Sequence, residues 1–293
     1  MKYLVITPVK DEQEHIEITL QSMLRQTVRP ARWIVVDDGS GDRTAEIVER
    51  YANEHDWIQL VRRPKGVERQ PGSPVVRAFH VGFELGRLLE FDYVVKLDGD
   101  LRIPASYFES LLAKFEQDPR LGIASGIYIE SNKPVPMPDY HAAGACKVIR
   151  ARCFEEIGGF VPSRGWDTVD EIRAQTRGWK TGHFPELTFD HLRPEGSYRG
   201  SLYTHRLHGE VYYLTGGSAL FFALKTAQRL VFGKPPLLGG VMLVAGYLKP
   251  CLLRRPRLVN REEARTYRRM LHARIWESMA GITGRKVAGG GQA

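Results

Sequence analysis

Short apolar runs alternate with amphipathic segments along the first 130 residues of the chain. Continuous apolar runs predict buried strands at residues 3–7, 33–37, 57–61, 93–97 and 121–130. Periodic segments predict helices between them, at residues 44–54, 75–90 and 104–117. Asp11 and Glu14 form a capping-box pattern that predicts a further helix, ending near Gln26. Strands separated by helices of this length indicate an α/β domain with a mostly parallel sheet.

Three of the predicted strands end in polar or acidic residues. The first ends in Thr7-Pro8, the second in the segment 37–40 (DDGS), and the fourth in the segment 98–100 (DGD). Because ligands of such sheets bind beyond the carboxyl ends of the strands, we expect these three ends to form one site.

Asp98 and Asp100 point the same way if their segment is extended, because side chains alternate along a strand. Both carboxylates then suit Mg²⁺ or Mn²⁺, which favour oxygen ligands. The alternative is a strand-ending turn with two solvated aspartates. Asp37 and Asp38 are similarly open to two interpretations, either a nucleotide contact or a turn that caps the next helix.

A third polar stretch lies later in the chain. Trp166 and Asp167 precede a predicted short helix that ends at Gly178. Asp167 is either a general base beside a stacked sugar ring or a carboxylate stabilised by the helix dipole. His191 is either a metal ligand or a loop histidine with a structural partner.

The order of these motifs resembles family 2 glycosyltransferases, which have the GT-A fold. The opening segment 6–44 is similar to the family's first motif block, which ends in V-D-D-G-S-x-D. VVKLDGD (94–100) is similar to its metal-binding D-x-D, and the segment from IGGF (157–160) to WK (179–180) is similar to the block that holds the catalytic base. The resemblance covers roughly residues 1–195, which we predict to be the catalytic domain.

The resemblance implies a role for each matching residue. Asp98 and Asp100 would hold Mn²⁺ or Mg²⁺, and we add His191 as a third candidate ligand. Asp167 aligns with the general base, and Asp170 is a reserve candidate because Trp166 stands where the family has a glutamate. The residues expected to contact the nucleotide and its diphosphate are Pro8, Val9, Glu12, Asp37, Asp38, Arg69 and Asp98, and those expected to contact the acceptor are Gly144, Ala145 and Trp166.

The implied reaction is a direct displacement that inverts the anomeric carbon. A sugar would pass from a nucleoside diphosphate sugar, with uridine the expected base, to a hydroxyl of a saccharide or lipid-linked acceptor. A sugar-nucleotide pyrophosphorylase shares the α/β layout, but the G-x-G-x-R loop of that class does not follow the first strand. A non-catalytic module that binds nucleotide sugars or a membrane surface is the remaining alternative.

The C-terminal part differs from the rest in composition. Residues 193–293 contain 17 Lys and Arg and 5 Glu, which gives them a net charge of +12. Because the whole chain has a net charge of +8, residues 1–192 carry −4. Its apolar stretches, 211–224 and 236–248, are shorter than the ~20 residues of a membrane-spanning helix. We predict a helical extension at 196–285 that binds a membrane surface or a second subunit, followed by a flexible tail at 286–293.

The remaining composition indicates the compartment and excludes one partner class. Hydrophobic residues make up 43% and charged residues 26% of the chain, as in folded proteins. Three cysteines without metal-ligand spacing, and no apolar leader, indicate the cytoplasm, with the chain peripheral on the cytoplasmic face of the membrane. Nucleic acid is not an expected partner, because the basic residues alternate with aliphatic runs rather than with stacking aromatics.

Overall fold

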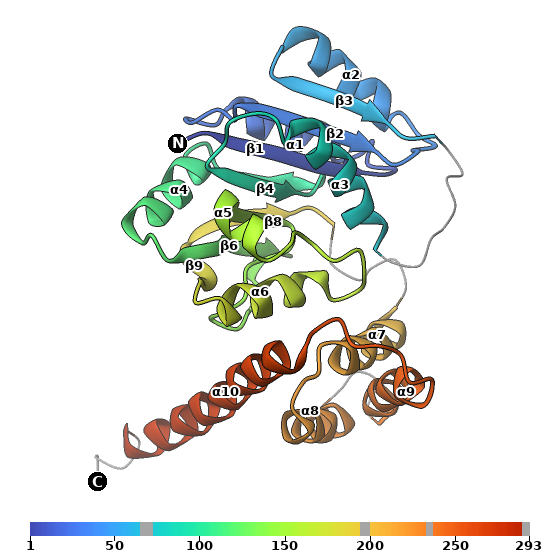
Figure 1. Ribbon diagram of the computed structural model, residues 1–293, viewed down its shortest axis with the longest axis vertical. Helices are drawn as coiled ribbons and strands as arrows, with labels where there is room; N and C mark the ends of the chain where they lie inside the picture. The colour runs from blue at the N-terminus through green and yellow to red at the C-terminus, as the bar shows by residue number, and fades with distance from the viewer. Residues whose placement is uncertain (65–72, 194–199, 233–236, 289–293) are drawn as a thin grey trace. The chain divides into compact units, whose positions relative to one another are not determined.

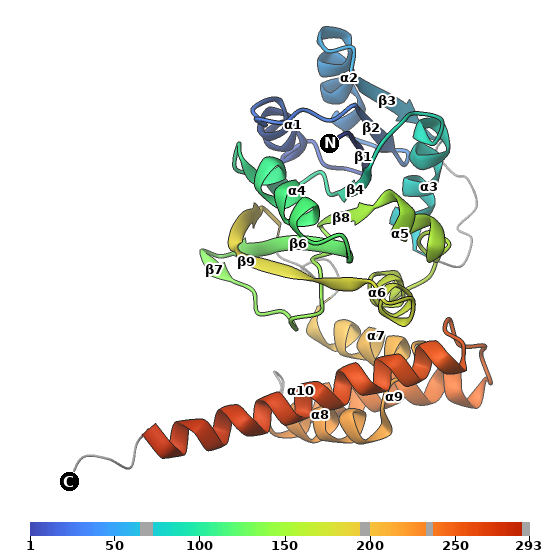
Figure 2. The ribbon, with the colours of Figure 1, turned by 60° about the vertical axis from the view of Figure 1, so that its left-hand side comes forward.

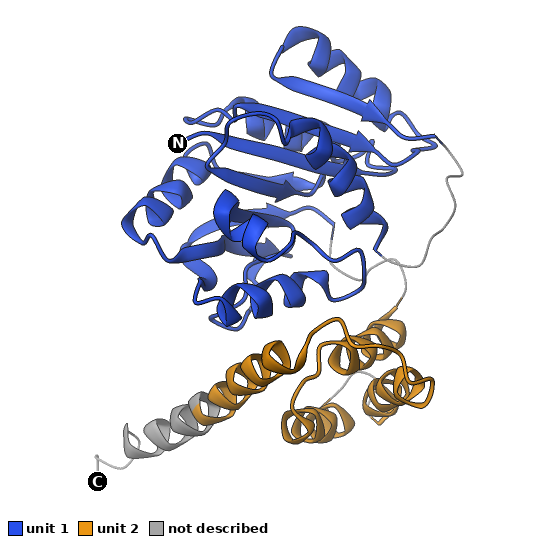
Figure 3. Cartoon of the chain, viewed as in Figure 1, with its two compact units in different colours: residues 1–195 blue, residues 196–293 orange. Residues whose placement is uncertain are grey.

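The computed structural model describes residues 1–64, 73–193, 200–232 and 237–288, with side chains up to residue 276. The chain divides into two compact units, residues 1–195 and residues 196–293, coloured blue and orange in Figure 3. The first unit contains a sheet with helices on both faces, and the second contains helices (Figure 1).

The sheet of the first unit has nine strands. Eight follow one another in the order β3-β2-β1-β4-β8-β6-β9-β5, and β7 pairs with β6. Pairing is parallel from β3 to β4 and between β6 and β9, and antiparallel around β8, β7 and β5, so the expected α/β fold has a mixed second half. The strands are β1 (Tyr3–Val9), β2 (Arg32–Asp37), β3 (Ile58–Arg62), β4 (Tyr93–Leu97), β5 (Leu101–Arg102), β6 (Leu121–Glu130), β7 (Lys133–Pro134), β8 (Cys146–Arg150) and β9 (Lys180–His191).

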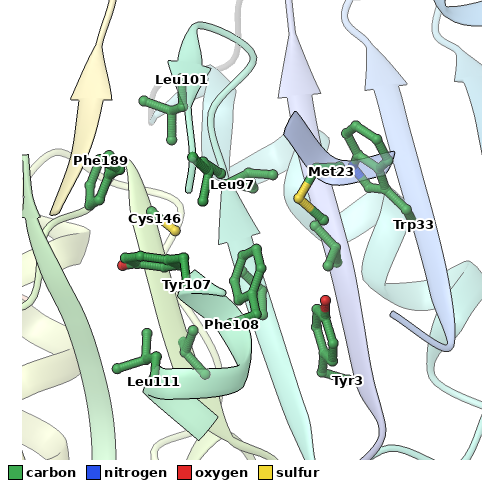
Figure 4. Close-up of a cluster of buried hydrophobic side chains, with 14 of the residues drawn as sticks. Tyr3, Met23, Trp33, Leu97, Leu101, Tyr107, Phe108, Leu111, Cys146 and Phe189 are labelled. Atoms are coloured by element: carbon green, nitrogen blue, oxygen red, sulfur yellow. The ribbon is translucent and has the colours of Figure 1, made fainter. Parts of the chain in front are cut away.

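Helices cover both faces of this sheet because the central strands are apolar on both sides. Along β1, Tyr3 and Val5 belong to one buried cluster, and Leu4 and Ile6 belong to the other. Figure 2 shows α1 and α4 on one side of the strands and α3 and α5 on the other, and Figure 4 shows part of the first cluster. The helices of this unit are α1 (Ile16–Leu24), α2 (Thr44–Glu54), α3 (Pro74–Gly86), α4 (Tyr107–Gln117), α5 (Ala151–Glu156) and α6 (Trp166–Thr176).

The predicted capping box does not form. Asp11 has a φ of 54°, and its carboxylate accepts a hydrogen bond of 2.7 Å from the backbone of Gly41 instead of capping a helix. Helix α1 begins only at Ile16, after a turn without a side-chain cap. A hydrogen bond therefore joins the loop after β1 to the loop after β2. Its two residues are far apart in the sequence, so a local sequence pattern could not predict it.

The turn between β4 and β5 needs a small residue at its centre. A Cβ on Gly99 would lie 2.8 Å from Val9 Cγ1 and 3.2 Å from Ile16 Cδ1. The buried hydroxyl of Thr19 holds the same turn, since it lies 2.8 Å from the carbonyl oxygen of Gly99 and 2.9 Å from the backbone nitrogen of Leu101. The aspartates on either side of Gly99 are thus fixed by the core.

The second unit is built on closely packed helices, α7 (Ser201–Leu214), α8 (Ala219–Phe232), α9 (Leu238–Leu252) and α10 (Arg261–Ala288). Helices α7 and α9 approach at glycines. A Cβ on Gly209 would lie 1.9 Å from the carbonyl oxygen of Leu243, and one on Gly246 would lie 1.9 Å from that of Arg206. Within the described residues, no helix combines the length and the apolar character that crossing a membrane requires.

Candidate active site

The carboxyl ends of three parallel strands meet at one edge of the sheet. Val9 of β1 lies beside Asp37 of β2 in parallel register, and β1 also pairs in parallel with β4, which leads into Asp98. The backbone nitrogen of Asp38 donates to the carbonyl oxygen of Val9 at 2.9 Å. The expected gathering of strand ends is therefore present.

Asp98, Asp100 and His191 form one cluster at this edge. One ligand atom from each residue, a carboxylate oxygen or a ring nitrogen, lies within 4.8 Å of the other two. His191 reaches the aspartates because it ends β9, which pairs with the short β5 that follows Asp100. Its Nε2 lies 3.5 Å from Asp100 Oδ2. The structure thus joins residues that are far apart in the sequence.

Two further acidic groups lie around this cluster. Glu130, at the end of β6, lies 2.9 Å from Nδ1 of His191. Glu12 receives two hydrogen bonds from the guanidinium of Arg193, at 3.0 and 2.8 Å. Burial and the negative charge of Asp100 raise the pKa of Glu12 to about 7, although Arg193 acts in the opposite direction. Glu12 and Glu130 therefore add two carboxyl groups to the surroundings of the cluster.

This donor set fits a divalent cation. Asp98 and Asp100 offer carboxylate oxygens, and His191 offers a ring nitrogen. The imidazole is backed by a carboxylate, that of Glu130, which is the usual arrangement behind a metal-ligating histidine. A cation at this position would also offset the negative charge that raises the pKa of Glu12.

The aspartates at the end of β2 have protein partners. Asp37 is buried, and its carboxylate accepts hydrogen bonds from the backbone nitrogen of Ser40, at 3.1 Å, and from the Ser40 hydroxyl. Asp38 forms a partly buried ion pair with Arg63, which follows β3. Asp37 therefore shapes the turn after β2, while Asp38 stays at the accessible edge of the sheet.

Lys96 links the aspartate cluster to the segment before β8. Its buried ammonium donates to Asp98 Oδ1 at 2.5 Å and to the carbonyl oxygen of Gly144 at 2.8 Å. The backbone nitrogen of Asp98 donates to the carbonyl oxygen of Ala145 at 2.8 Å. A Cβ on Gly144 would lie 3.6 Å from the ring of Trp166. Gly144 and Ala145 thus lie between the cluster and α6.

Helix α6 begins at Trp166, so Trp166 and Asp167 lie in its first turn rather than before it. Asp167 is partly exposed, and its Cβ would lie 3.8 Å from a Cβ on Gly144. Asp170, one turn later, is fully buried. It pairs with the ammonium of Lys147 at 3.0 Å, and burial raises the pKa of its carboxyl to about 7. Of the two carboxylates, that of Asp170 has no exposed surface, whereas Asp167 is partly exposed.

A buried ionic network holds the start of α6. Lys147, which has no exposed surface, contacts Asp170 at 3.0 Å, Glu171 at 3.2 Å and the carbonyl oxygen of Asp167 at 3.0 Å. Glu171 also lies 3.0 Å from Nδ1 of His141. The side chain of Lys147 therefore ties β8 to the turn of backbone that carries Asp167.

A family model described as "Glycosyl transferase family 2" matches residues 4–165, which is more than half of the chain. The chain belongs to this family. It is 28% identical over 131 residues to the uncharacterized glycosyltransferase EpsJ of Bacillus subtilis, a match covering 44% of this chain and 34% of EpsJ. It is also 28% identical over 116 residues to poly-beta-1,6-N-acetyl-D-glucosamine synthase of Staphylococcus aureus, covering 40% of this chain and 26% of that protein. The matched part spans about a third or less of these relatives' own length.

Solved structures share the fold of this family 2 glycosyltransferase. TarS 1-349 of S. aureus, in complex with UDP-GlcNAc, has a TM-score of 0.53 at 16% identity over 91% of this chain and 78% of that one. The mannosyltransferase PcManGT from Pyrobaculum calidifontis, in complex with GDP-Man and Mn²⁺, has a TM-score of 0.55 at 17% identity over 96% of this chain and 80% of that one. These likenesses confirm the expected GT-A fold.

Several charged residues of the site in this family 2 glycosyltransferase have no role in the predicted motifs. Lys96 lies inside the segment 94–100, whose predicted chemistry rests on its two aspartates, and Arg193 begins the basic C-terminal part. A lysine inside a five-residue buried strand is itself a signal, because such a charge needs a partner. Glu130 and Lys147 carry no comparable pattern. Arg69, expected at the diphosphate, lies outside the described residues.

Proposed function

We propose that this family 2 glycosyltransferase moves a sugar from a nucleoside diphosphate sugar to a hydroxyl group, with inversion at the anomeric carbon. The observation that carries this proposal is the meeting of Asp98, Asp100 and His191 at the strand edge. That cluster has the donor set for a divalent cation, and a diphosphate is a ligand that such a cation commonly binds. We assign Mn²⁺ or Mg²⁺ to it.

Asp167 is the proposed general base. It would accept the proton of the acceptor hydroxyl while the acceptor oxygen attacks the anomeric carbon and the bond from that carbon to the diphosphate oxygen breaks. A cation bound at the cluster would supply positive charge that stabilises the leaving diphosphate. Gly144 and Ala145 would lie beside the acceptor, where small side chains allow close approach, and Trp166 would support it.

The nucleotide is proposed to bind across the ends of β1 and β2. Pro8 and Val9 lie beside Val36 and Asp37 in the sheet, and Asp38 follows at its accessible edge. Asp37 would act by fixing the turn, and Asp38 by accepting hydrogen bonds from the base or ribose. A uridine donor is our first choice, supported by the UDP-GlcNAc complex of TarS, with guanosine as the second because PcManGT was solved with GDP-Man.

The acceptor is proposed to be a saccharide or a lipid-linked saccharide in polysaccharide synthesis. The poly-beta-1,6-N-acetyl-D-glucosamine synthase likeness supports this class. Exposed leucines on α8 and α9, such as Leu224, Leu248 and Leu252, support contact of the second unit with a membrane surface, on its cytoplasmic side. A second subunit on these apolar faces is the competing occupant.

Hydrolysis of nucleotide sugars, in which water replaces the acceptor, tests the reaction. We expect turnover of a UDP-sugar or GDP-sugar with Mn²⁺ and its loss in EDTA. Asp167→Asn should lower the rate by about 10²–10⁴-fold, the usual contribution of a general base, while donor binding is retained. The matched control is Asp56→Asn, an exposed aspartate between α2 and β3. A chain that binds donors but hydrolyses none, with or without metal, would instead be the non-catalytic module.

A further inference from the structure

Lys96 is a buried cation directly beside the candidate ion cluster. It lies in β4, two residues before Asp98, and only 4% of its surface is exposed. Its ammonium lies 2.5 Å from Oδ1 of Asp98, and among the residues that the structure describes Asp98 is the only carboxylate that pairs with it. One of the side chains that offer a ligand atom to a divalent ion is therefore already paired with a positive charge.

The ammonium of Lys96 is held from three directions. Besides Asp98, it contacts the carbonyl oxygen of Gly144, to which it donates at 2.8 Å. It also lies 5.6 Å from the centre of the Trp166 ring, which is within the range of a cation–π contact. Because Lys96 is buried between β4, the segment before β8 and the start of α6, its charge stays beside Asp98 when an ion approaches.

Two lysines lie side by side across β4 and β8, and they pair with different carboxylates. Lys96 is opposite Lys147 in the antiparallel register, and both ammoniums lie over the ring of Trp166, at 5.6 and 5.4 Å from its centre. Lys147 pairs with Asp170 and Glu171 of α6. The charge of Lys147 is thus compensated by α6, whereas the charge of Lys96 is compensated by a candidate ligand of the ion.

The charge of Lys96 acts in opposite directions on the two ligands of the proposed donor site. The carboxylates of Asp98 and Asp100 balance the charge of a divalent ion, and Lys96 adds one positive charge to this set. The nearby Glu12 and Arg193 compensate each other. Two unit charges about 4 Å apart interact strongly even at an effective dielectric constant of about 20. Lys96 therefore repels an ion that arrives alone and attracts a diphosphate.

We propose that Lys96 weakens binding of the divalent ion alone and strengthens binding of the diphosphate to the ion-loaded cluster. This inference rests on the proposed function, because it takes the ion and a nucleoside diphosphate sugar as the ligands of the site. Lys96 acts through its charge and through Asp98, so it is a positioning residue rather than a catalytic one. As a result, the ion is bound tightly only while the diphosphate is present.

Isothermal titration of Lys96→Met with Mn²⁺, and then with UDP or GDP at saturating Mn²⁺, tests this role. We expect Mn²⁺ alone to bind about 10-fold more tightly than in the wild type and the nucleotide to bind about 10-fold more weakly, because the removed charge acts on a cation and an anion with opposite signs. Lys96→Gln, whose amide still donates a hydrogen bond but has no charge, should change both affinities in the same directions. Thermal unfolding verifies that the variants fold.

The matched control is Lys2→Met. Lys2 directly precedes β1, at the end of the strand away from the cluster, and its exposed ammonium pairs with Glu90 at 3.0 Å. Because salt screens an exposed charge at this distance, the control should leave both affinities within about twofold of the wild type.

The direction of the two changes decides the outcome. Weaker binding of both Mn²⁺ and nucleotide in the Lys96 variants would mean that Lys96 only maintains the shape of the site, and it would overturn the proposal while leaving sugar transfer intact. Unchanged affinities would overturn it in the same way. A wild type that binds no Mn²⁺, either alone or with nucleotide, would remove the ion site itself and with it the metal-dependent reaction.

Discussion

Glu130 shows how one side chain outside every predicted motif can determine the properties of the site. Its carboxylate lies 2.9 Å from Nδ1 of His191, on the far side of the ring from Asp100. Removing such a supporting carboxylate usually weakens metal binding by about 10–100-fold, because the ring loses its orientation. We therefore expect Glu130→Gln to weaken Mn²⁺ binding by this factor in isothermal titration. An unchanged affinity would mean that His191 does not ligate the ion.

The aspartates of the strand ends could be predicted from the sequence, and their surroundings could not. Asp98 and Asp100 follow an apolar strand, and this pattern can be recognised in the sequence alone. Lys96, Glu130 and Arg193 reach the site through strand pairing and turns, over separations that no local pattern encodes. The sequence therefore predicts the two aspartates of the cluster but not the charged residues that surround them.

Helix α6 depends on a buried cation for its position. Lys147 has no exposed surface and pairs with Asp170 and Glu171. Lys147→Met would remove the cation that pairs with both buried carboxylates and leave Glu171 with His141 alone as an ionic partner, and breaking a buried pair in this way typically costs about 3–5 kcal/mol of unfolding free energy. We expect this loss in a urea titration of the variant.

The matched control is Lys180→Met. Lys180 pairs with Asp118 at 2.5 Å, but its side chain is 51% exposed. Exposed pairs contribute about 0–1 kcal/mol, so the control should unfold close to the wild type. Equal losses in both variants would show that the network around Lys147 does not stabilise α6.

Most elements could be predicted from periodicity, while some boundaries could not. Residues 44–54 and 93–97 match α2 and β4. Helix α1 differs because its predicted cap, Asp11, is bound to Gly41 in another loop. The mixed half of the sheet was also missed, because β8 and β5 are short strands whose direction depends on tertiary pairing.

The two units separate the candidate active site from the basic helices. Every residue assigned to the donor, the cation or the base lies within residues 1–195, whereas the helices proposed to contact a membrane surface lie within residues 196–293. Composition alone separated the two parts, since residues 1–192 carry −4 and the remainder +12.

A glycine at the α7–α9 crossing tests this separation. Gly246→Ala would place a Cβ 1.9 Å from the carbonyl oxygen of Arg206, so the helices must move apart. We expect a loss of about 1–3 kcal/mol in unfolding free energy and weaker vesicle binding, with Mn²⁺ affinity unchanged. In the control Gly41→Ala the nearest atom to the new Cβ is Asp11 Oδ1 at 3.7 Å, an ordinary contact, so this variant should change neither stability nor vesicle binding. Reduced Mn²⁺ affinity in Gly246→Ala would contradict the separation.

Mn²⁺ binding, followed by electron paramagnetic resonance with and without UDP or GDP, tests the central claim most directly. The account predicts that the wild type binds Mn²⁺, that one of the two nucleotides tightens this binding, and that D98N/D100N loses it by more than about 100-fold. Nucleotide-dependent Mn²⁺ binding that is equal in the wild type and in D98N/D100N would contradict the assignment of the donor site to these strand ends.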